Sequence, residues 1–170
     1  MMGLGLSPRG DPYLVFEFGE GGVSERVAFA LAASQVFQVI EPRPLTKVPL
    51  APDMVLGIMN HRGNIITVVD PAPLLDQPRQ PDVAAALLVI VRPMASDKPP
   101  HVALQIDRTH GIVLSSELPR TEVTVGPCVA WVARLGQRLI HILDLGHFFE
   151  HFGRLFGPAD FRTSRQGVAG

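Results

Sequence analysis

The chain has 170 residues, of which 46% are hydrophobic and 18% charged, and its formal net charge at pH 7 is −1. This balance excludes an intrinsically disordered chain and allows one domain, or two small lobes that share a core. A nearly neutral chain with scattered arginines also lacks the basic footprint of a nucleic-acid-binding protein.

The N-terminal segment, residues 1–12, lacks a basic start followed by an apolar run, so we expect a flexible lead-in and no secretory signal. The longest apolar run, residues 83–91, is about half as long as a membrane-spanning helix and is typical of a buried strand. A single cysteine, Cys128, rules out an internal disulfide and favours a reducing compartment. We therefore expect a cytoplasmic protein with no direct membrane insertion.

The first half of the chain is expected to form short strands, because prolines and glycines, 16 of each in the chain, interrupt it. Residues 13–18 and 26–31 predict a hairpin with a glycine-rich tip. Residues 32–41 fit one helical turn that leads into a strand, and the prolines of residues 41–53 predict an extended connector. Residues 64–70 predict a further strand that ends in a carboxylate.

The second half repeats this rhythm of strands and turns. Residues 86–93, 101–107 and 111–119 predict strands, and residues 128–144 predict a hairpin that turns at Leu135-Gly136-Gln137. Only residues 145–156 have convincing helical spacing. The apolar face of this helix would be formed by Leu145, Phe148, Phe149 and Phe152. The polar tail, residues 157–170, is expected to fray.

The chain also resembles itself at an offset of roughly 74 residues. Residues 13–18 align with 86–91, residues 26–31 with 101–106, and residues 64–75 with 138–149. The similarity is weak at each position but consistent in order; the alternative is that any two β-rich halves look alike. We predict a mostly β fold of two SH3-like five-stranded β-barrel lobes around a shared core, with a few short helices, including a C-terminal one.

The expected domain spans residues 13–152, followed by a tail at 153–170. One lobe would comprise approximately residues 13–80 and the other residues 81–152, with elements exchanged between them.

Asp70 and Asp144 occupy equivalent positions in the two halves, which raises the alternative of a two-lobed hydrolase. An aspartic protease presents each carboxylate on a turn that contains a hydroxyl and a glycine. Here Pro-Ala-Pro follows Asp70 and Leu-Gly-His follows Asp144. We expect each carboxylate instead to end a strand and to cap the next turn or helix. A small-ligand sensor with a pocket between the lobes is a second alternative.

Other chemistries find little support in the sequence. His147 and His151 have the spacing of two zinc ligands, but Glu150 is not in the metalloprotease position and no third ligand is evident. The remaining histidines share no spacing, and Cys128 is expected to be a small buried thiol. We therefore predict no enzyme activity, no metal and no cofactor.

The sequence Asn60-His61-Arg62-Gly63 predicts a tight turn before a strand. Gly63 would satisfy the backbone geometry, and the side chain of Asn60 could accept hydrogen bonds from turn N–H groups. Arg62 has no such structural purpose. Its planar guanidinium suits carboxylates or carbonyls of another molecule, although a solvated turn arginine with a local partner is the alternative.

The sequence around this turn resembles that of a known family, the CheW-like domains. The segment "PDMVLGIMNHRGNIITVVDPAPLL" is similar to the family's proline-flanked entry, its apolar-Gly-apolar step, its Asn-x-Arg-Gly turn and its strand with a terminal Asp. The resemblance runs from about Tyr13 to Phe152.

The resemblance implies two SH3-like barrels and a free-standing adaptor, because no kinase, phosphotransfer or receiver module is present. Its partners would be the cytoplasmic tip of a methyl-accepting chemoreceptor and the regulatory domain of a CheA-type histidine kinase. Arg62 and Gly63 fall on the family's Arg-Gly, Gly57 on its preceding glycine, and Val36 on an apolar groove position; we add Asn60 to these expected contacts.

The chain departs from the family pattern at three places. Gln38 replaces a common glutamate, Asp107-Arg108 replaces Asp-Gly in the second lobe, and Asp70-Pro71 replaces Asp-Leu. Gln38 removes one charge from the expected contact surface. These changes suit a divergent coupler, for example one that serves pilus motility.

Overall fold

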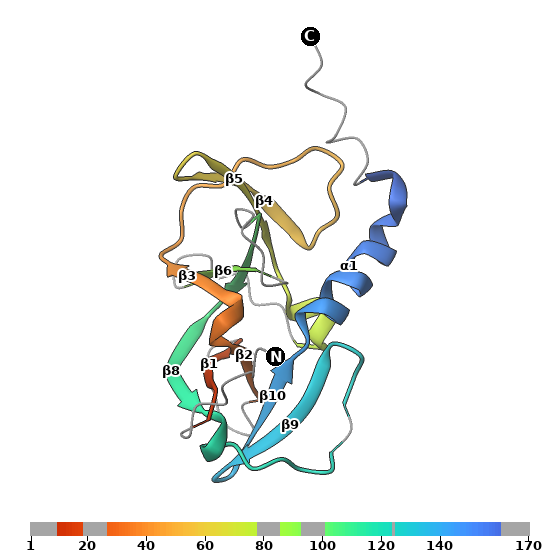
Figure 1. Cartoon of the computed structure of the whole chain (residues 1–170). Coiled ribbons are helices and arrows are strands. Elements are labelled where there is room, and N and C mark those ends of the chain that lie inside the picture. Colours follow the sequence, from red (N-terminus) through yellow and green to blue (C-terminus); the bar gives the residue numbers. More distant parts are fainter. Residues whose placement is uncertain (1–9, 19–26, 78–85, 93–100, 124, 161–170) are drawn as a thin grey trace, which may run out of the picture.

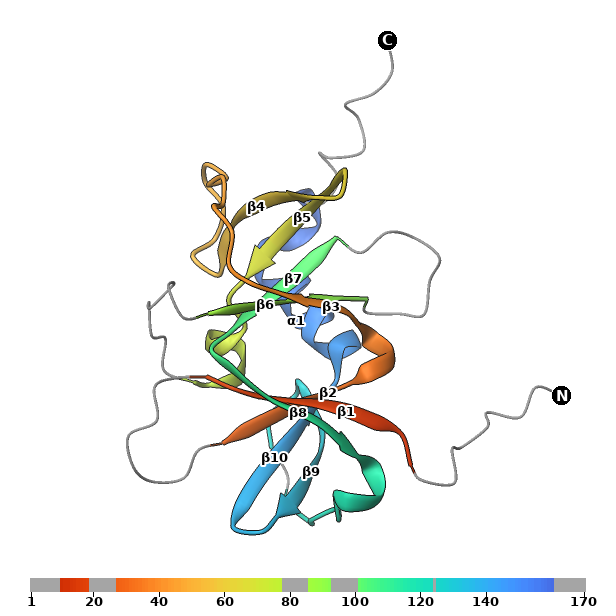
Figure 2. The ribbon, with the colours of Figure 1, turned by 90° about the vertical axis from the view of Figure 1, so that its left-hand side faces the viewer.

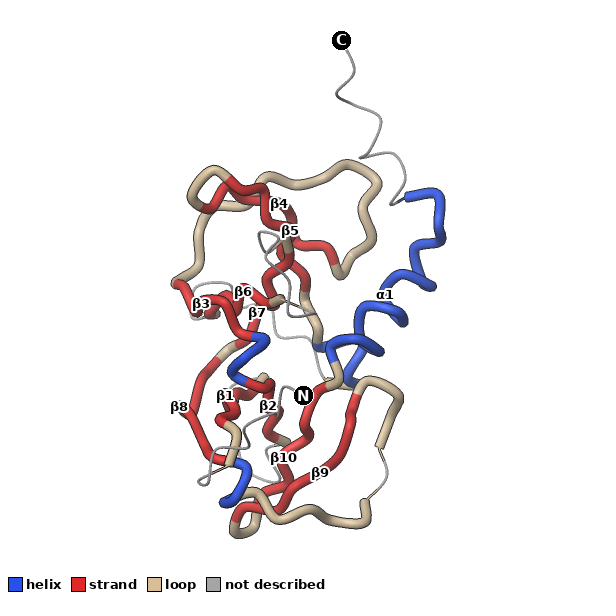
Figure 3. Tube along the Cα trace, in the orientation of Figure 1, coloured by secondary structure: helices blue, strands red, loops and turns tan. Residues whose placement is uncertain are grey.

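The computed structural model describes residues 10–18, 27–77, 86–92, 101–123 and 125–160, with side chains as far as Arg154. Ten strands, three short 3-10 helices and one α-helix lie within these residues (Figures 1 and 3). The first five strands are β1 (Pro12–Glu17), β2 (Ala28–Ala32), β3 (Val36–Ile40), β4 (Val55–His61) and β5 (Asn64–Val69). The other five are β6 (Leu87–Val91), β7 (Val102–Ile106), β8 (Arg108–Leu114), β9 (Val129–Leu135) and β10 (Arg138–Leu143). The 3-10 helices are η1 (Ala33–Gln35), η2 (Ala72–Leu75) and η3 (Ser115–Glu117), and the α-helix is α1 (Leu145–Asp160).

The predicted hairpins are confirmed. β1 pairs with β2 in antiparallel fashion, although the predicted glycine-rich tip lies outside the described residues. β9 pairs with β10 around a turn at Gly136, which has a φ of +61°. The ambiguous residues 32–41 form one 3-10 turn, η1, that leads directly into β3.

The C-terminal helix begins where the apolar spacing predicts it. Leu145, Phe148 and Phe152 are buried and Phe149 is half-buried. The helix continues to Asp160, so the first residues of the tail that was expected to fray are helical. Adding one more turn to an existing helix requires no new nucleation, which explains the extension. No helix in the described part of the chain is long and apolar enough to cross a membrane.

The ten strands form two sheets, which we name sheet A and sheet B. The order in sheet A is β8-β1-β2-β10-β9, and the order in sheet B is β3-β6-β7-β5-β4. The internal repeat aligns β1 with β6, β2 with β7 and β10 with β5, so the two orders coincide. Strand directions agree as well, since β2–β10 and β7–β5 are the parallel pairs of their sheets. The weak sequence repeat therefore corresponds to a structural repeat.

Each sheet combines strands from both halves of the chain. The chain passes from sheet A to sheet B through η1 and returns between β7 and β8 at Asp107 (Figure 2). The N–H of Asp107 donates to the carbonyl of Glu17 at 3.1 Å, which holds this crossing against β1. The Asp107-Arg108 step needs no left-handed residue, and the positive φ of this strand, +84°, falls on Gly111 instead.

Three apolar clusters form the core, and one of them holds the two sheets together. A shared cluster lies between the sheets, and each sheet also covers a smaller cluster with its other face. β6 illustrates the alternation: Val89 and Val91 join the shared cluster, whereas Leu88 and Ile90 join the cluster of sheet B. Both faces of β6 are therefore buried, which explains its uninterrupted apolar sequence. The shared core that the sequence predicts is present.

The outer strands of both sheets are partly covered by the connectors that follow them. After β3 the chain makes an isolated bridge from Thr46 to Ile58 of β4, and after β8 it makes one from Arg120 to Ala133 of β9. The two bridges are equivalent under the repeat. They supply hydrogen bonds at sheet edges that would otherwise expose backbone groups.

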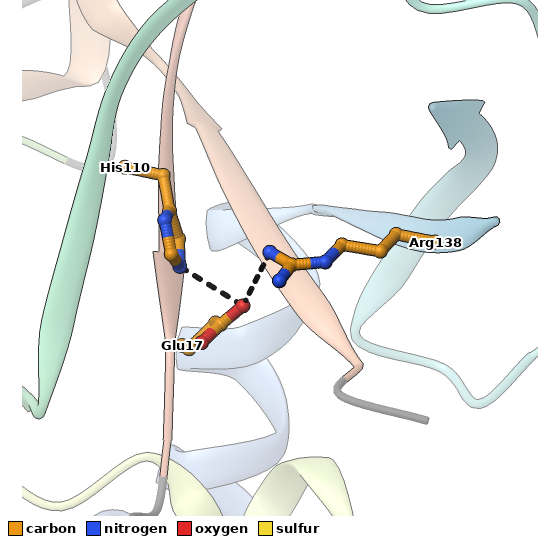
Figure 4. Close-up of polar contacts among 3 residues, drawn as sticks. All are labelled: Glu17, His110 and Arg138. Carbon is orange, nitrogen blue, oxygen red and sulfur yellow. Dashed lines mark hydrogen bonds and ion pairs between the residues drawn. The ribbon is translucent and has the colours of Figure 1, made fainter. Parts of the chain in front are cut away.

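A cluster of three polar side chains around a buried carboxylate ties three strands of sheet A together (Figure 4). Glu17 on β1 is only 2% exposed, and its carboxylate lies 2.9 Å from His110 Nε2 on β8 and 3.0 Å from Arg138 Nη1 on β10. A buried carboxylate requires such partners. The cluster therefore fixes the outer strand β8 to β1 and β10.

Candidate functional site

The β4–β5 hairpin carries the turn that the sequence singles out. His61 and Asn64 are paired, which leaves a two-residue turn of Arg62 and Gly63 with φ values of +52° and +85°. These are the φ signs of a type I′ turn, whose twist matches that of the strands. Asn60 Oδ1 accepts the N–H of Gly63 at 2.9 Å. The structural roles expected for Asn60 and Gly63 are confirmed.

Arg62 occupies this turn against its conformational preference. A left-handed backbone costs an arginine about 1–2 kcal/mol relative to its preferred regions, and Asn or Gly is the usual residue there. The side chain is exposed and forms no ion pair with any residue that the structure describes. A strained, exposed cation without a local partner is a candidate for contact with another molecule.

Gly57 acts through the backbone of the same strand. It is buried with a φ of +150°, and a Cβ there would lie 2.7 Å from the carbonyl oxygen of Thr46. Thr46 is the residue whose bridge to Ile58 holds the connector against β4. The absence of a side chain at Gly57 therefore lets the connector pack beside the Arg62 hairpin.

Val36 and Gln38 lie on β3, at the opposite edge of sheet B. Val36 is half-buried against the shared cluster. Gln38 pairs with Ile90, so its side chain lies on the face of the sheet B cluster. The expected contact residues thus form two groups, one at the Arg62 turn and one on β3.

His61 joins these two groups, and sequence reasoning did not identify it. Its Nε2 lies 3.1 Å from Oε1 of Gln38, across 23 residues of sequence, and the residue is only 4% exposed. With a carboxamide oxygen as acceptor, Nε2 carries the proton. Nδ1 is buried with no hydrogen-bond partner among the described residues. No local pattern marks this contact, because the two strands meet only in the folded sheet.

The surroundings of His61 keep it neutral. Burial lowers the pKa of His61, and the nearby positive charges of Arg43 and Arg62 lower it further. The His61–Gln38 contact is therefore a hydrogen bond between two uncharged groups at neutral pH.

An apolar edge, also missed by sequence reasoning, runs along the outer strands of the two sheets. We define it by Phe37 and Val39 of β3 and Ile112 of β8, which are 41%, 37% and 57% exposed. Val39 is paired with Val89 and Ile112 with Leu14, so both project from the faces that cover the shared cluster. The guanidinium of Arg92 lies 4.6 Å from the centre of the Phe37 ring. Figure 1 shows β3 and β8 on the same side of the molecule.

The two aspartates have the capping roles that their sequence positions predict. Asp70 follows β5 and accepts the N–H of Ala72 at 3.0 Å; Asp144 follows β10 and accepts the N–H of His147 at 3.0 Å. Hydrogen bonds from the backbone and ring of His147 hold the pKa of Asp144 below its usual value. Both carboxylates are thus engaged at the ends of strands.

The other candidate groups have structural surroundings. His147 Nδ1 lies 2.8 Å from Asp144, and the described residues contain no cluster of three or more metal-ligating side chains. Cys128 is buried, and burial together with Asp144 raises the pKa of its thiol, which disfavours the nucleophilic thiolate.

Replacing Gly57 by alanine tests the packing role of this residue. We expect Gly57→Ala to lower the free energy of unfolding by about 2 kcal/mol, because a Cβ meets a fixed carbonyl and the backbone is left-handed. Urea denaturation measures the change. Gly126→Ala is the matched control, since open space surrounds that position, and it should change stability by less than about 0.5 kcal/mol. Equal effects of the two substitutions would contradict the packing role.

The lowered pKa of His61 predicts a pH dependence of stability. The unfolded chain takes up a proton on this histidine near pH 6.5, whereas the folded protein resists it. Stability should therefore fall as the pH drops from about 7.5 to 5.5. Urea midpoints across this range should fall less in His61→Leu, with part of the slope remaining because burial also lowers the pKa of His141. An unchanged slope in His61→Leu would show that protonation of His61 is not resisted.

Comparison with known proteins agrees with the fold. The family model of the CheW-like domain matches residues 12–152. The fold is similar to that of the scaffolding protein TtCheW from Thermoanaerobacter tengcongensis, with a TM-score of 0.67 and 23% sequence identity, over 83% of this chain and 93% of that chain. No curated protein sequence matches significantly. The structural similarity establishes the fold, and the family model, which matches most of the chain, establishes the family. The chain belongs to the family of CheW-like domains.

Proposed function

We propose that this protein is a non-enzymatic adaptor that couples chemoreceptors to a CheA-type histidine kinase in a bacterial chemosensory pathway. Family membership supports the role, and the observation that carries it is Arg62, an exposed cation in a strained turn with no ion-pair partner in the described residues. A strained cation of this kind adds nothing to the stability of the chain itself. The gain is expected in a complex, where the guanidinium meets an acceptor on a partner.

The two sheets would serve as two SH3-like barrels. The connectors after β3 and β8 pair with β4 and β9, and each sheet covers an apolar cluster of its own, which supports closure of each sheet on itself. Barrels of this kind present loops and outer strands on a rigid body. Each would offer a separate surface to a partner.

The receptor surface would be the apolar edge of Phe37, Val39 and Ile112, together with Val36 and Gln38. A chemoreceptor tip is a helical hairpin, and an apolar helix face can pack on exposed apolar side chains of two outer strands. Ile112 and Val39 are the most suitable anchors, because both are exposed although they face the same side as the shared cluster.

The kinase surface would be the β4–β5 hairpin, with Asn60, Arg62 and Gly63 at its tip and Gly57 supporting it. Pairing with a homologous barrel of the kinase regulatory domain would leave the receptor surface free. One rigid body that holds both partners raises their effective concentration, so modest single affinities are sufficient. The protein would act in the cytoplasm and be recruited to receptor arrays at the inner membrane, with no nucleic acid and no membrane insertion involved.

The two alternatives receive less support from the same observations. A hydrolase that used Asp70 and Asp144 would need carboxylates free for proton transfer, yet each accepts a backbone N–H at the end of its strand. A small-ligand sensor would need a closed pocket between the sheets, where the shared apolar cluster lies.

Reversing the charge of Arg62 tests the kinase surface. We expect Arg62→Glu to reduce capture of the kinase regulatory domain at least tenfold, because the substitution places a carboxylate where an acceptor binds (about 1.4 kcal/mol). Thermal unfolding should be unchanged, since the side chain forms no ion pair with any described residue.

Arg154→Glu, a charge reversal at an exposed residue of α1, is the control and should bind normally. If Arg62→Glu bound the kinase and the receptor as well as wild type does, Arg62 would be a solvated turn residue with no role in binding.

Single charges on the apolar edge test the receptor surface. Val39→Asp and Ile112→Asp should each weaken binding of a receptor-tip fragment about tenfold or more, because a carboxylate would be buried against an apolar helix face. Calorimetry measures the affinity. Val48→Asp, on the connector and 40% exposed, is the control of matched exposure. If both edge variants kept the receptor affinity of wild type, the receptor would bind at a surface other than the apolar edge.

A further inference from the structure

His61 lies between the two proposed partner surfaces without belonging to either. It is the last residue of β4, it precedes Arg62 directly, and at 4% exposure it is too buried to touch a partner. Its hydrogen bond ends at Gln38, which lies between Phe37 and Val39 on β3. β3 and β4 are the outer strands of sheet B and are not hydrogen-bonded neighbours. This side-chain contact therefore connects two edges that the ladder of sheet B does not join directly.

We propose that the His61–Gln38 hydrogen bond couples the Arg62 turn to the apolar edge, so that a partner bound at one surface changes the affinity of the other surface. The inference rests on the proposed function, because it assigns the two surfaces to two partners. His61 acts as a positioning residue: it transmits a displacement of the turn to β3, and it contacts neither partner.

The energy of this contact is large enough for such coupling. If a bound partner shifted the turn and separated Nε2 from Gln38, both ring nitrogens would be buried without partners, because Nδ1 already has none in the described structure. A buried, unsatisfied polar group costs about 1–3 kcal/mol. That range equals typical coupling free energies between two binding sites, which correspond to about 5–150-fold changes in affinity.

The geometry of the hairpin makes the contact difficult to bypass. Asn60 holds the turn through the N–H of Gly63, so Arg62 is confined to the left-handed conformation that follows His61. A partner that binds the guanidinium therefore acts on a turn whose backbone is held in one conformation. The nearest element able to respond is the strand end that carries His61.

A half-buried histidine of sheet A offers a matched control. His141 lies on β10, burial lowers its pKa as it lowers that of His61, and its ring centre lies 5.4 Å from that of Phe29. β10 belongs to neither proposed partner surface. His141→Leu thus removes a histidine from the other sheet without touching the Arg62 turn or the apolar edge.

The test measures how much a saturating kinase regulatory domain changes the affinity for a receptor-tip fragment, both taken from the bacterium that encodes this chain. We expect a change of about fivefold or more in wild type, and a change close to onefold in His61→Leu, with each separate affinity retained. His61→Gln, whose amide can again donate to Gln38, should restore the coupling, and His141→Leu should keep it. If His61→Leu showed coupling as large as that of wild type, or if wild type showed none, the inference would be overturned while the adaptor role stayed intact. Failure of wild type to bind either partner would overturn both.

The connection between the Arg62 turn and β3 can also be tested without either partner. Arg62→Gly relaxes the left-handed turn, and amide hydrogen exchange of β3 reports whether the strand responds. We expect a change in β3 exchange when His61 is present and none in the His61→Leu background. The same change in both backgrounds would mean that the turn reaches β3 by another route.

Discussion

Burial of one face of each sheet in the shared apolar cluster fixes sheet A against sheet B, and both proposed partner surfaces depend on that packing. Phe16, Phe29 and Phe148 of this cluster are at most 1% exposed. Each fully buried phenylalanine contributes about 2–3 kcal/mol, whereas a single hydrogen bond contributes about 1 kcal/mol. Packing therefore determines the relative position of the sheets. Within the packed sheets, the polar contacts of Glu17 and His61 determine the positions of the outer strands β8 and β3.

The exchange of strands between the halves explains why one rigid body can hold two surfaces. The first half contributes β3, β4 and β5 to sheet B, and the second half contributes β8, β9 and β10 to sheet A, so that β3 and β8 are outer strands of sheets completed by the other half. Neither sheet can form from one half of the chain alone. The apolar edge, which has residues from both β3 and β8, therefore exists only when the whole domain is folded, so binding there reports an intact adaptor.

Local sequence signals predicted the elements because those signals depend on neighbouring residues. The short apolar run around Phe16, the turn at Gly136 and the helical spacing from Leu145 to Phe152 each act within a few residues. The same holds for Asn60, Gly63 and the two capping aspartates, whose hydrogen bonds span two or three residues. Exposure of Phe37, Val39 and Ile112 could not be predicted in this way, because it depends on which strands become outer strands. The His61–Gln38 contact joins residues 23 apart and left no local pattern.

Arg62 and His61 are adjacent in sequence yet differ in every property that matters for recognition. Arg62 is exposed and charged. His61 is buried, and burial together with the charge of Arg62 keeps it neutral. A partner carboxylate that pairs with Arg62 would offset the positive field at His61 and so favour its protonation. A protonated ring would carry a donor at Nδ1 as well, buried with no acceptor among the described residues. The neutral Gln38 offers no charge to stabilise that form, whereas a glutamate at this position would. Gln38 therefore keeps its contact with His61 a hydrogen bond between uncharged groups, whose strength is insensitive to salt.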